Sequence, residues 1–268
     1  MHWTTLILLF LGCVVLGLAS GILSGLLGAG GGLIVVPGLA FLLRFSTIAS
    51  AIQMHIAIGT SLATMIIVAA RSLRSHMKHQ TKFFAIYKKM APGVILGVVS
   101  ASILAHFIRS HTLSIIFGIF VFVMAYTLFF NKKPTPGVKL PGSLIMLSAG
   151  YFVGVMSGLL GVAGSAFSVP FLIKYDTQMR VAVVVSVAIA MTVSIFGTMT
   201  YVFTGIDVPN LPRWSTGYVY WPAWIGVVIG GMISAPFGAK WSYLVSDAKL
   251  KRYFAIFLLF VGTEMLWP

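Results

Sequence analysis

Long apolar runs separated by short polar stretches occupy most of the chain, and this pattern predicts membrane-spanning helices. The long runs cover residues 4–27, 50–70, 83–107, 112–130, 143–160, 181–204, 218–239 and 252–267. Two other runs, 33–43 and 165–173, are too short to cross, because at about 1.5 Å per residue each covers about half of a hydrocarbon core of roughly 30 Å. We therefore expect two half-helices among full-length spans.

Each short run follows a glycine-rich segment, and the two segments are copies of one motif. Residues 21–37 read GILSGLLGAGGGLIVVP, and residues 154–170 read GVMSGLLGVAGSAFSVP. A backbone interrupted at membrane depth is stable only where protein or a water-filled cavity supplies partners for its N–H and C=O groups. Paired breaks of this kind are typical of transporters and predict one central site between them.

The repeat extends beyond the glycines. Residues 53–57 (QMHIA) match residues 178–182 (QMRVA), and Ser61 matches Ser186. Prolines and lysines between the two copies indicate an exposed connection. The chain thus divides into a first repeat at 1–130, a linker at 131–142 and a second repeat at 143–268.

The distribution of Lys and Arg indicates how the repeats are oriented, since cytoplasmic loops carry the excess of both. If each broken segment doubles back as a hairpin, 15 of the 18 Lys and Arg lie inside, and only Arg44, Arg109 and Arg213 lie outside. If each crosses once, the split is 10 to 8. The hairpin arrangement is favoured, although segment 4–27 is long enough to cross fully.

This arrangement predicts an all-α integral membrane protein made of two inverted repeats. Each repeat is a glycine-broken helical hairpin plus three transmembrane helices. The linker is then cytoplasmic, and both termini lie outside the cytoplasmic (inner) membrane of the cell.

Composition supports a multi-pass membrane protein and limits the partners to consider. Hydrophobic residues make up 59% of the chain and charged residues 8%, with a mean hydropathy of +1.03. The net charge of +14 is explained by cytoplasmic loops facing anionic lipid, so no nucleic acid partner is needed. A single cysteine, Cys13, excludes an internal disulfide and a thiolate metal cluster.

The paired motif resembles the sulfite exporter TauE/SafE family over essentially the whole chain. The resemblance rests on Ser24 to Gly32 with Pro37, on the second copy from Ser157 to Pro170, and on Ala57 to Ser61. It implies a permease that moves small sulfur oxyanions or organosulfonates, such as sulfite and thiosulfate, generally outward. The second copy departs from the motif, because Gly30 and Gly32 of the first copy correspond to Ala163 and Ser165, and the Gly-Thr pair is lost.

The residues of the breaks suit an anion on chemical grounds. Glycines allow backbone N–H groups to approach a ligand, and the partly positive N-terminus of a half-helix points toward each break. With hydroxyl and amide donors, these groups complement the acceptor oxygens of a sulfonate. The candidate substrate-binding residues are Ser24, Gly28, Gly30, Gly31, Gly32, Gln53, Thr60 and Ser61 in the first copy, and Ser157, Gly161, Gly164, Ser165, Gln178 and Ser186 in the second.

His55 and Arg180 occupy matching positions in the two copies and are candidates for a gate or a proton-linked step. Each of these assignments has a structural alternative. The glycines at i and i+4 are also suited to close helix packing, and most serines in spans bond back to their own helix. His55 and Arg180 have the positions of residues that anchor helix ends at the interface.

The membrane potential alone can drive the export of an anion without coupling to another ion. Moving one negative charge out of an inside-negative cell releases about 2.3 kcal/mol per 100 mV. A cation transporter or channel, linked to Na⁺ or H⁺, is the alternative, because broken helices also expose carbonyl ends. We expect no enzyme activity, cofactor or metal. The expected partners are a small anion and the lipid bilayer, and the sequence leaves open a homo-oligomer and the coupling ion.

Overall fold

A computed structural model describes residues 3–27, 31–77, 83–130, 140–175, 177–241 and 247–266, and nearly all of them are helical. Ten helices and one short β-hairpin make up this part of the chain. In order they are α1 (Trp3–Leu27), α2 (Gly32–Arg44), α3 (Ser50–Met77), α4 (Phe83–Phe107), α5 (Ser110–Phe130), α6 (Ser143–Leu160), α7 (Ser165–Lys174), α8 (Met179–Gly205), β1 (Ser215–Thr216), β2 (Val219–Tyr220), α9 (Trp221–Trp241) and α10 (Asp247–Leu266).

Seven of these helices are long and apolar enough to cross a membrane, namely α1, α3, α4, α5, α6, α8 and α9. The prediction of an all-α membrane protein is confirmed. One boundary was wrong, because the apolar run predicted from residue 218 begins with strand β2, and helix α9 starts only at Trp221. Apolar aromatic residues continue through this join, so hydropathy alone does not mark it.

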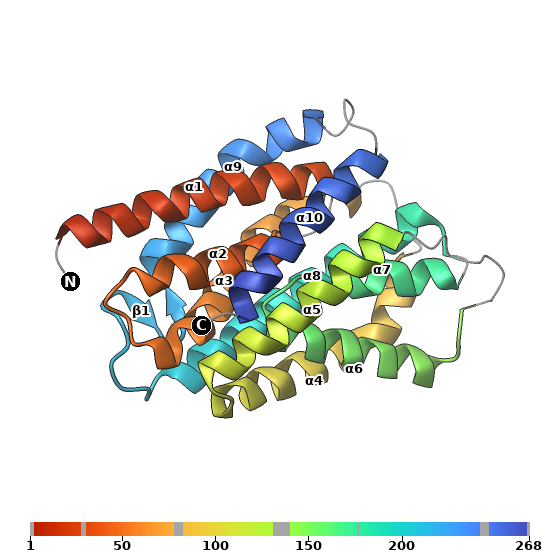
Figure 1. Cartoon of the computed structure of the whole chain (residues 1–268). Helices are drawn as coiled ribbons and strands as arrows, with labels where there is room; N and C mark the ends of the chain where they lie inside the picture. Colours follow the sequence, from red (N-terminus) through yellow and green to blue (C-terminus); the bar gives the residue numbers. More distant parts are fainter. Residues whose placement is uncertain are drawn as a thin grey trace.

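The two short helices follow the glycine breaks as expected. Helix α2 has 13 residues and begins after Gly31, while α7 has 10 residues and begins after Gly164. Helix α6 ends at Gly161, whose φ of 64° is left-handed and terminates the helix without the strain that a side chain would bring. Figure 1 shows α1 entering from the left with α2 turning back toward it, and α6 and α7 making the same turn from the right.

The long helices pack in pairs through glycines. Helix α4 packs against α6, where a Cβ on Gly97 would overlap the carbonyl oxygen of Tyr151 and one on Gly154 would overlap that of Val94. Helix α1 packs against α9 in the same way, with Gly230 on the carbonyl of Val14. The close-packing interpretation of the motif glycines is therefore correct for Gly154.

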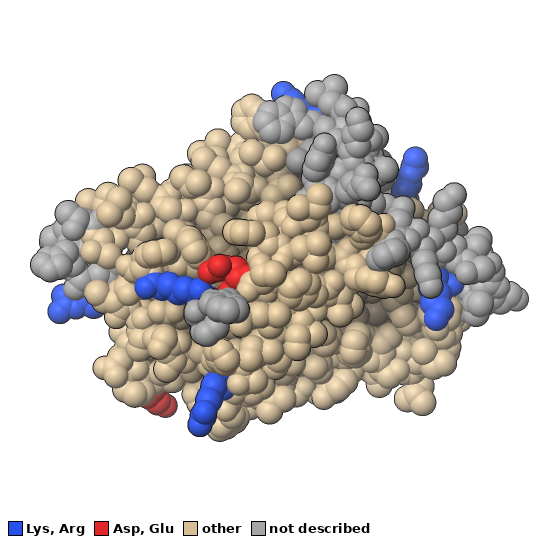
Figure 2. All heavy atoms as spheres, viewed as in Figure 1, with Lys and Arg blue, Asp and Glu red and all other residues tan. Residues whose placement is uncertain are grey.

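The surface is largely apolar, as a lipid-facing surface must be. Leu8, Phe107, Leu144 and Phe260 are each more than two-thirds exposed. The face in Figure 2 is mostly uncharged, with few Lys, Arg, Asp or Glu side chains. Helix α3 packs against α8 in the interior, and α5 packs against α10.

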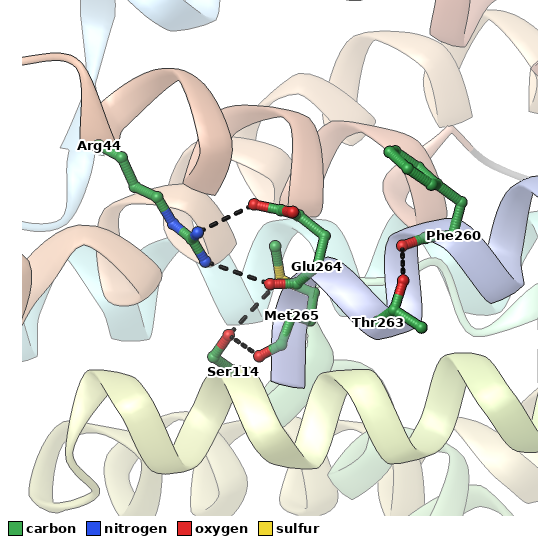
Figure 3. Close-up of polar contacts among 6 residues, drawn as sticks. All are labelled: Arg44, Ser114, Phe260, Thr263, Glu264 and Met265. Atoms are coloured by element: carbon green, nitrogen blue, oxygen red, sulfur yellow. Dashed lines mark hydrogen bonds and ion pairs between the residues drawn. The ribbon is translucent and has the colours of Figure 1, made fainter. Parts of the chain in front are cut away.

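One ion pair fastens the C-terminal helix to the first half-helix (Figure 3). Arg44 at the end of α2 donates from Nη1 to Oε1 of Glu264 in α10 at 2.9 Å, and from Nη2 to the Glu264 carbonyl at 3.4 Å. Ser114 of α5 donates to the carbonyl of Met265 at 2.8 Å. Glu264 thus holds α10 to α2, and the neighbouring Met265 holds α10 to α5.

The glycine contact between α4 and α6 can be tested with a paired substitution. Gly97→Val should destabilise the protein by about 3 kcal/mol, because the new side chain has to push α6 away. Gly142→Ala is the control, since a Cβ there has no atom within 4 Å. Thermal unfolding in detergent, followed by tryptophan fluorescence, measures both; equal stability of the Gly97→Val variant and the control would contradict the packing described.

Candidate functional site

The start of α2 lies against the second glycine break. A Cβ added to Gly32, at the start of α2, would lie 2.7 Å from the carbonyl oxygen of Gly161 and 3.1 Å from Cα of Val162. The first residue of one half-helix therefore touches the break that precedes the other. No bulkier residue fits at position 32 without separating the two breaks.

The second break has its carbonyls satisfied by neighbouring helices. The hydroxyl of Ser61 in α3 donates to the carbonyl of Gly161 at 3.0 Å, and the hydroxyl of Tyr201 in α8 donates to that of Gly158 at 3.0 Å. The Gly161 N–H donates to the carbonyl oxygen of Ser157 at 2.9 Å. The interrupted backbone is thus supported from both central helices.

The N-termini of the half-helices have no such support from side chains. Gly31 and Gly164 are the N-cap residues of α2 and α7, and neither helix has a side-chain cap. The first N–H groups of a helix have no partner within it, and they carry a partial positive charge. Such uncapped ends leave N–H donors available to an anion.

A cavity of about 550 Å³ begins at the breaks. Its walls come from α1, α3, α8, α9 and the segment around the start of α7. The lining residues are Ser24 of α1; Met65, Ile67, Val68, Ala69, Arg71 and Ser72 of α3; Ala163 and Ser165 at the start of α7; Val183, Val187 and Ala190 of α8; and Gly231, Met232, Ala235 and Pro236 of α9. A smaller space of about 50 Å³ adjoins it and is lined in part by Gly31 and Gly32. Together they connect the start of α2 and the start of α7 to one opening.

Charge in this cavity is positive. Arg71 is the one ionisable residue among the lining residues, all of which belong to the described part of the chain, and it is exposed at the far end from the breaks. Ser24, Ser72 and Ser165 add hydroxyls, and the remaining lining side chains are apolar apart from the glycine. Such a lining offers hydrogen-bond donors to a negatively charged molecule.

The cavity extends from the breaks toward one end of the protein. Its walls use the last part of α3, the first part of α8 and the last part of α9, which lie on the right and upper side of Figure 1. We call this the basic end, because its described helix ends carry Arg71, Arg74, Lys88, Lys89, Lys174, Arg180 and Lys240. Arg44, Arg109 and Arg213 belong to the opposite end.

The predicted site residues divide into four groups, of which the last, Gln53, Gln178, His55 and Arg180, lies away from the cavity. Ser24, Gly31, Gly32 and Ser165 line the cavities. Six others support the breaks or their surroundings: Thr60, Ser61, Ser157, Gly161, Gly164 and Ser186. Gly28 and Gly30 lie outside the described residues.

Three of the hydroxyls expected at the site have hydrogen-bond partners within the protein. Thr60 accepts the N–H of Tyr220 at 3.1 Å, Ser186 accepts the hydroxyl of Ser168 at 2.8 Å, and Ser61 donates to Gly161. Ser157 differs from these three, because its side chain is fully buried and its Oγ has no hydrogen-bond partner. Position in the repeat therefore does not give the role of each hydroxyl.

The two glutamines lie away from the cavity. Gln53 donates from Nε2 to the carbonyls of Leu43 at 3.2 Å and Ile48 at 2.9 Å, so it fixes the turn between α2 and α3. Gln178 is the exposed N-cap residue of α8 and makes no side-chain cap bond. Substrate binding by either is not supported by this geometry.

His55 and Arg180 do not line the cavity either. His55 is 3% exposed, with Nε2 at 2.9 Å from the carbonyl of Ala105 and its ring stacked on Tyr218 at 5.0 Å. Arg180 is exposed at the basic end. The matching sequence positions thus have different surroundings in the two halves.

Several lining residues were not predicted, notably Met65, Arg71 and the α9 residues Gly231, Met232 and Ala235. Arg71 was counted only among the cytoplasmic charges. Its place at the end of the span that carries Thr60 and Ser61 could have indicated that it lines the site. Met65 gave none, because a methionine in an apolar run is typical of any packed helix.

Comparison with known proteins places the chain among membrane transporters. A family model described as "Sulfite exporter TauE/SafE" matches residues 13–265. A probable membrane transporter protein of Haemophilus influenzae is 30% identical over 94% of this chain and 96% of its own length. Probable membrane transporter proteins of Bacillus subtilis and Methanocaldococcus jannaschii are 23% and 27% identical over similar shares. No solved structure matches.

The support of the second break gives a prediction on stability. Ser61→Ala should destabilise the protein by about 1–3 kcal/mol, because it leaves the buried Gly161 carbonyl without its donor. Ser148→Ala, which removes an exposed hydroxyl bonded within α6, should change stability by less than about 0.5 kcal/mol. Unfolding of both variants in one detergent measures the difference, and an unchanged Ser61→Ala variant would show that the bond does not support the break.

Proposed function

The chain belongs to the sulfite exporter TauE/SafE family, and from this membership we propose that it is a permease that exports a small sulfur-containing anion across the cytoplasmic membrane. Its similarity to probable membrane transporters supports membrane transport as the activity. Sulfite, thiosulfate and small organosulfonates are the proposed substrates.

The cavity between the breaks carries the proposal of an anion. The cavity reaches the uncapped N-terminus of α7, and the smaller space that adjoins it reaches that of α2. Its hydroxyls come from Ser24, Ser72 and Ser165, and its one charged lining residue is Arg71. A sulfur oxyanion has several acceptor oxygens and needs such donors. At about 550 Å³ the volume is within the usual range of small-molecule sites.

Carbonyl oxygens would be the ligands of a transported cation, and two of those at the second break already accept hydrogen bonds from side chains. Gly161 accepts from Ser61, and Gly158 accepts from Tyr201. The N-termini of the half-helices have no side-chain caps, and this difference favours an anion over Na⁺.

We propose further that the two halves are inverted repeats, with the basic end in the cytoplasm and both termini outside. The packing of α1 on α9 and of α6 on α4 supports this, because these pairs exchange equivalent helices of the two halves. The preference of cytoplasmic ends for Lys and Arg supports the orientation. The cavity would then load from the cytoplasm, as export requires.

Flux from proteoliposomes tests the function. An inside-negative potential should increase the efflux of labelled sulfite or thiosulfate, because an anion leaving the lumen moves down the electrical gradient. Each candidate is measured separately, with protein-free liposomes as the blank. Flux of Na⁺ or K⁺ without anion flux would contradict the proposal.

Arg71 gives this assay a matched set of variants. Arg71→Gln should raise the substrate KM by about threefold to tenfold, since an exposed charge attracts anions but is partly screened by solvent. Arg71→Lys keeps the charge and should restore most of the affinity. Arg74→Gln is the control, because Arg74 is exposed on the same helix and does not line the cavity.

Labelling from the two sides tests the orientation. In a Cys13→Ala background, Lys88→Cys and Lys240→Cys should react with an impermeant thiol reagent from the cytoplasmic side, and Arg109→Cys and Arg213→Cys from the outer side. Reaction of Lys88→Cys and Lys240→Cys from opposite sides would overturn the inverted arrangement, because the two ends share a side only if each broken segment doubles back.

A further inference from the structure

The β1–β2 hairpin, which joins α8 to α9, lies at the end of the protein opposite the basic end. Tyr218, Val219 and Tyr220 are 3%, 0% and 1% exposed, so β2 is inserted into the helices, while Thr216 of β1 stays exposed. Strand β2 contacts α3, α8 and α9. These are the helices whose other halves form walls of the cavity.

Glycines let the hairpin backbone sit directly on the central helices. A Cβ on Gly59 of α3 would lie 2.8 Å from the Tyr218 carbonyl, and one on Gly205 of α8 would lie 2.6 Å from the Tyr218 N–H nitrogen. Gly217 itself has a φ of +55° and overlies Val202. No side chain separates the hairpin from its seat at these points.

The same two helices connect the hairpin to the second glycine break. Thr60 accepts the Tyr220 N–H, and the next residue, Ser61, donates to the Gly161 carbonyl. On α8, the Tyr201 carbonyl accepts the Tyr218 N–H at 3.2 Å, while its hydroxyl donates to Gly158. A displacement of the break would therefore move the residues of α3 and α8 that hydrogen-bond to the hairpin.

One side-chain contact fastens the hairpin to α4. The Tyr218 hydroxyl lies 3.0 Å from Nδ1 of the half-buried His106, and its ring is stacked on His55. Burial raises the pKa of the Tyr218 hydroxyl, so it stays protonated at neutral pH and can donate to Nδ1. The cluster forms a latch at the end of the protein opposite the basic end.

We propose that the β1–β2 hairpin is the outer gate of the permease and that the Tyr218–His106 contact latches it. The inference rests on the proposed transport function, because an exporter loaded from the basic end has to release its cargo at the other. The hairpin has two residues in each strand and few bonds to the helices, so it can leave its seat without unfolding a span.

The native Cys13 of α1 reports on this gate. It is fully buried, and it packs against the part of α9 that follows the hairpin, where a Cβ added to Gly226 would lie 2.9 Å from the Cys13 Cβ. When the hairpin lifts, Cys13 should become accessible to an impermeant thiol reagent applied on the side that carries Arg213. In wild-type vesicles, this modification should be slow.

Breaking the latch should increase the rate. Tyr218→Phe keeps the ring and removes the hydroxyl, and we expect Cys13 to react about twofold to tenfold faster, as for the loss of one ordinary hydrogen bond. His106→Ala should have the same effect. The double variant should react no faster than either single variant, because both remove the same interaction.

Two controls accompany these variants. Leu104→Ala changes an exposed side chain of α4 and should leave the rate unchanged. Cys13→Ala should give no labelling. An unchanged rate in Tyr218→Phe, or an equal increase in Leu104→Ala, would overturn the gate.

The assay separates the gate from the proposed substrate, because the reagent reacts whether or not an anion is present. A response of Cys13 to the latch variants, with no flux of any sulfur anion, would keep the gate and reject the substrate. Anion flux with a Cys13 rate that ignores the latch would keep the substrate and reject the gate.

Discussion

An interrupted backbone in an apolar environment needs partners for its N–H and C=O groups, and the rest of the structure depends on how this requirement is met. At the second break the carbonyls of Gly158 and Gly161 receive hydroxyl donors from Tyr201 and Ser61. The N-termini of α2 and α7 receive no side-chain cap. The asymmetry leaves donors facing the centre, and donors are what an anion needs.

The remaining architecture brings these ends together and controls access to them. Gly32 lets α2 touch the second break, and glycines on α4, α6, α1 and α9 let the surrounding helices pack backbone to backbone. The walls of the cavity extend from the breaks toward the basic end, while the buried strand β2 is packed among the central helices at the opposite end. The two ends of the molecule therefore differ in how far the helices are separated.

The sequence predicts the fold well because its main signals are local. Run length and the repeated glycines correctly indicate α2, α7 and the long spans. The β1–β2 hairpin was missed because its aromatic residues extend the apolar run of α9. Side-chain roles depend on neighbours distant in the chain: Thr60 meets a residue 160 positions away, and Ser61 one 100 positions away. Spacing alone could not distinguish these supporting hydroxyls from ligands such as those expected at Ser24 and Ser165.

A structure determined with bound thiosulfate tests the central claim most directly. The account predicts density for the anion at the inner end of the cavity, between the N-termini of α2 and α7 and within hydrogen-bonding distance of Ser24 or Ser165. Density at the outer rim near Tyr218, or a cation coordinated by the carbonyls of Gly158 and Gly161 in place of Tyr201 and Ser61, would contradict it.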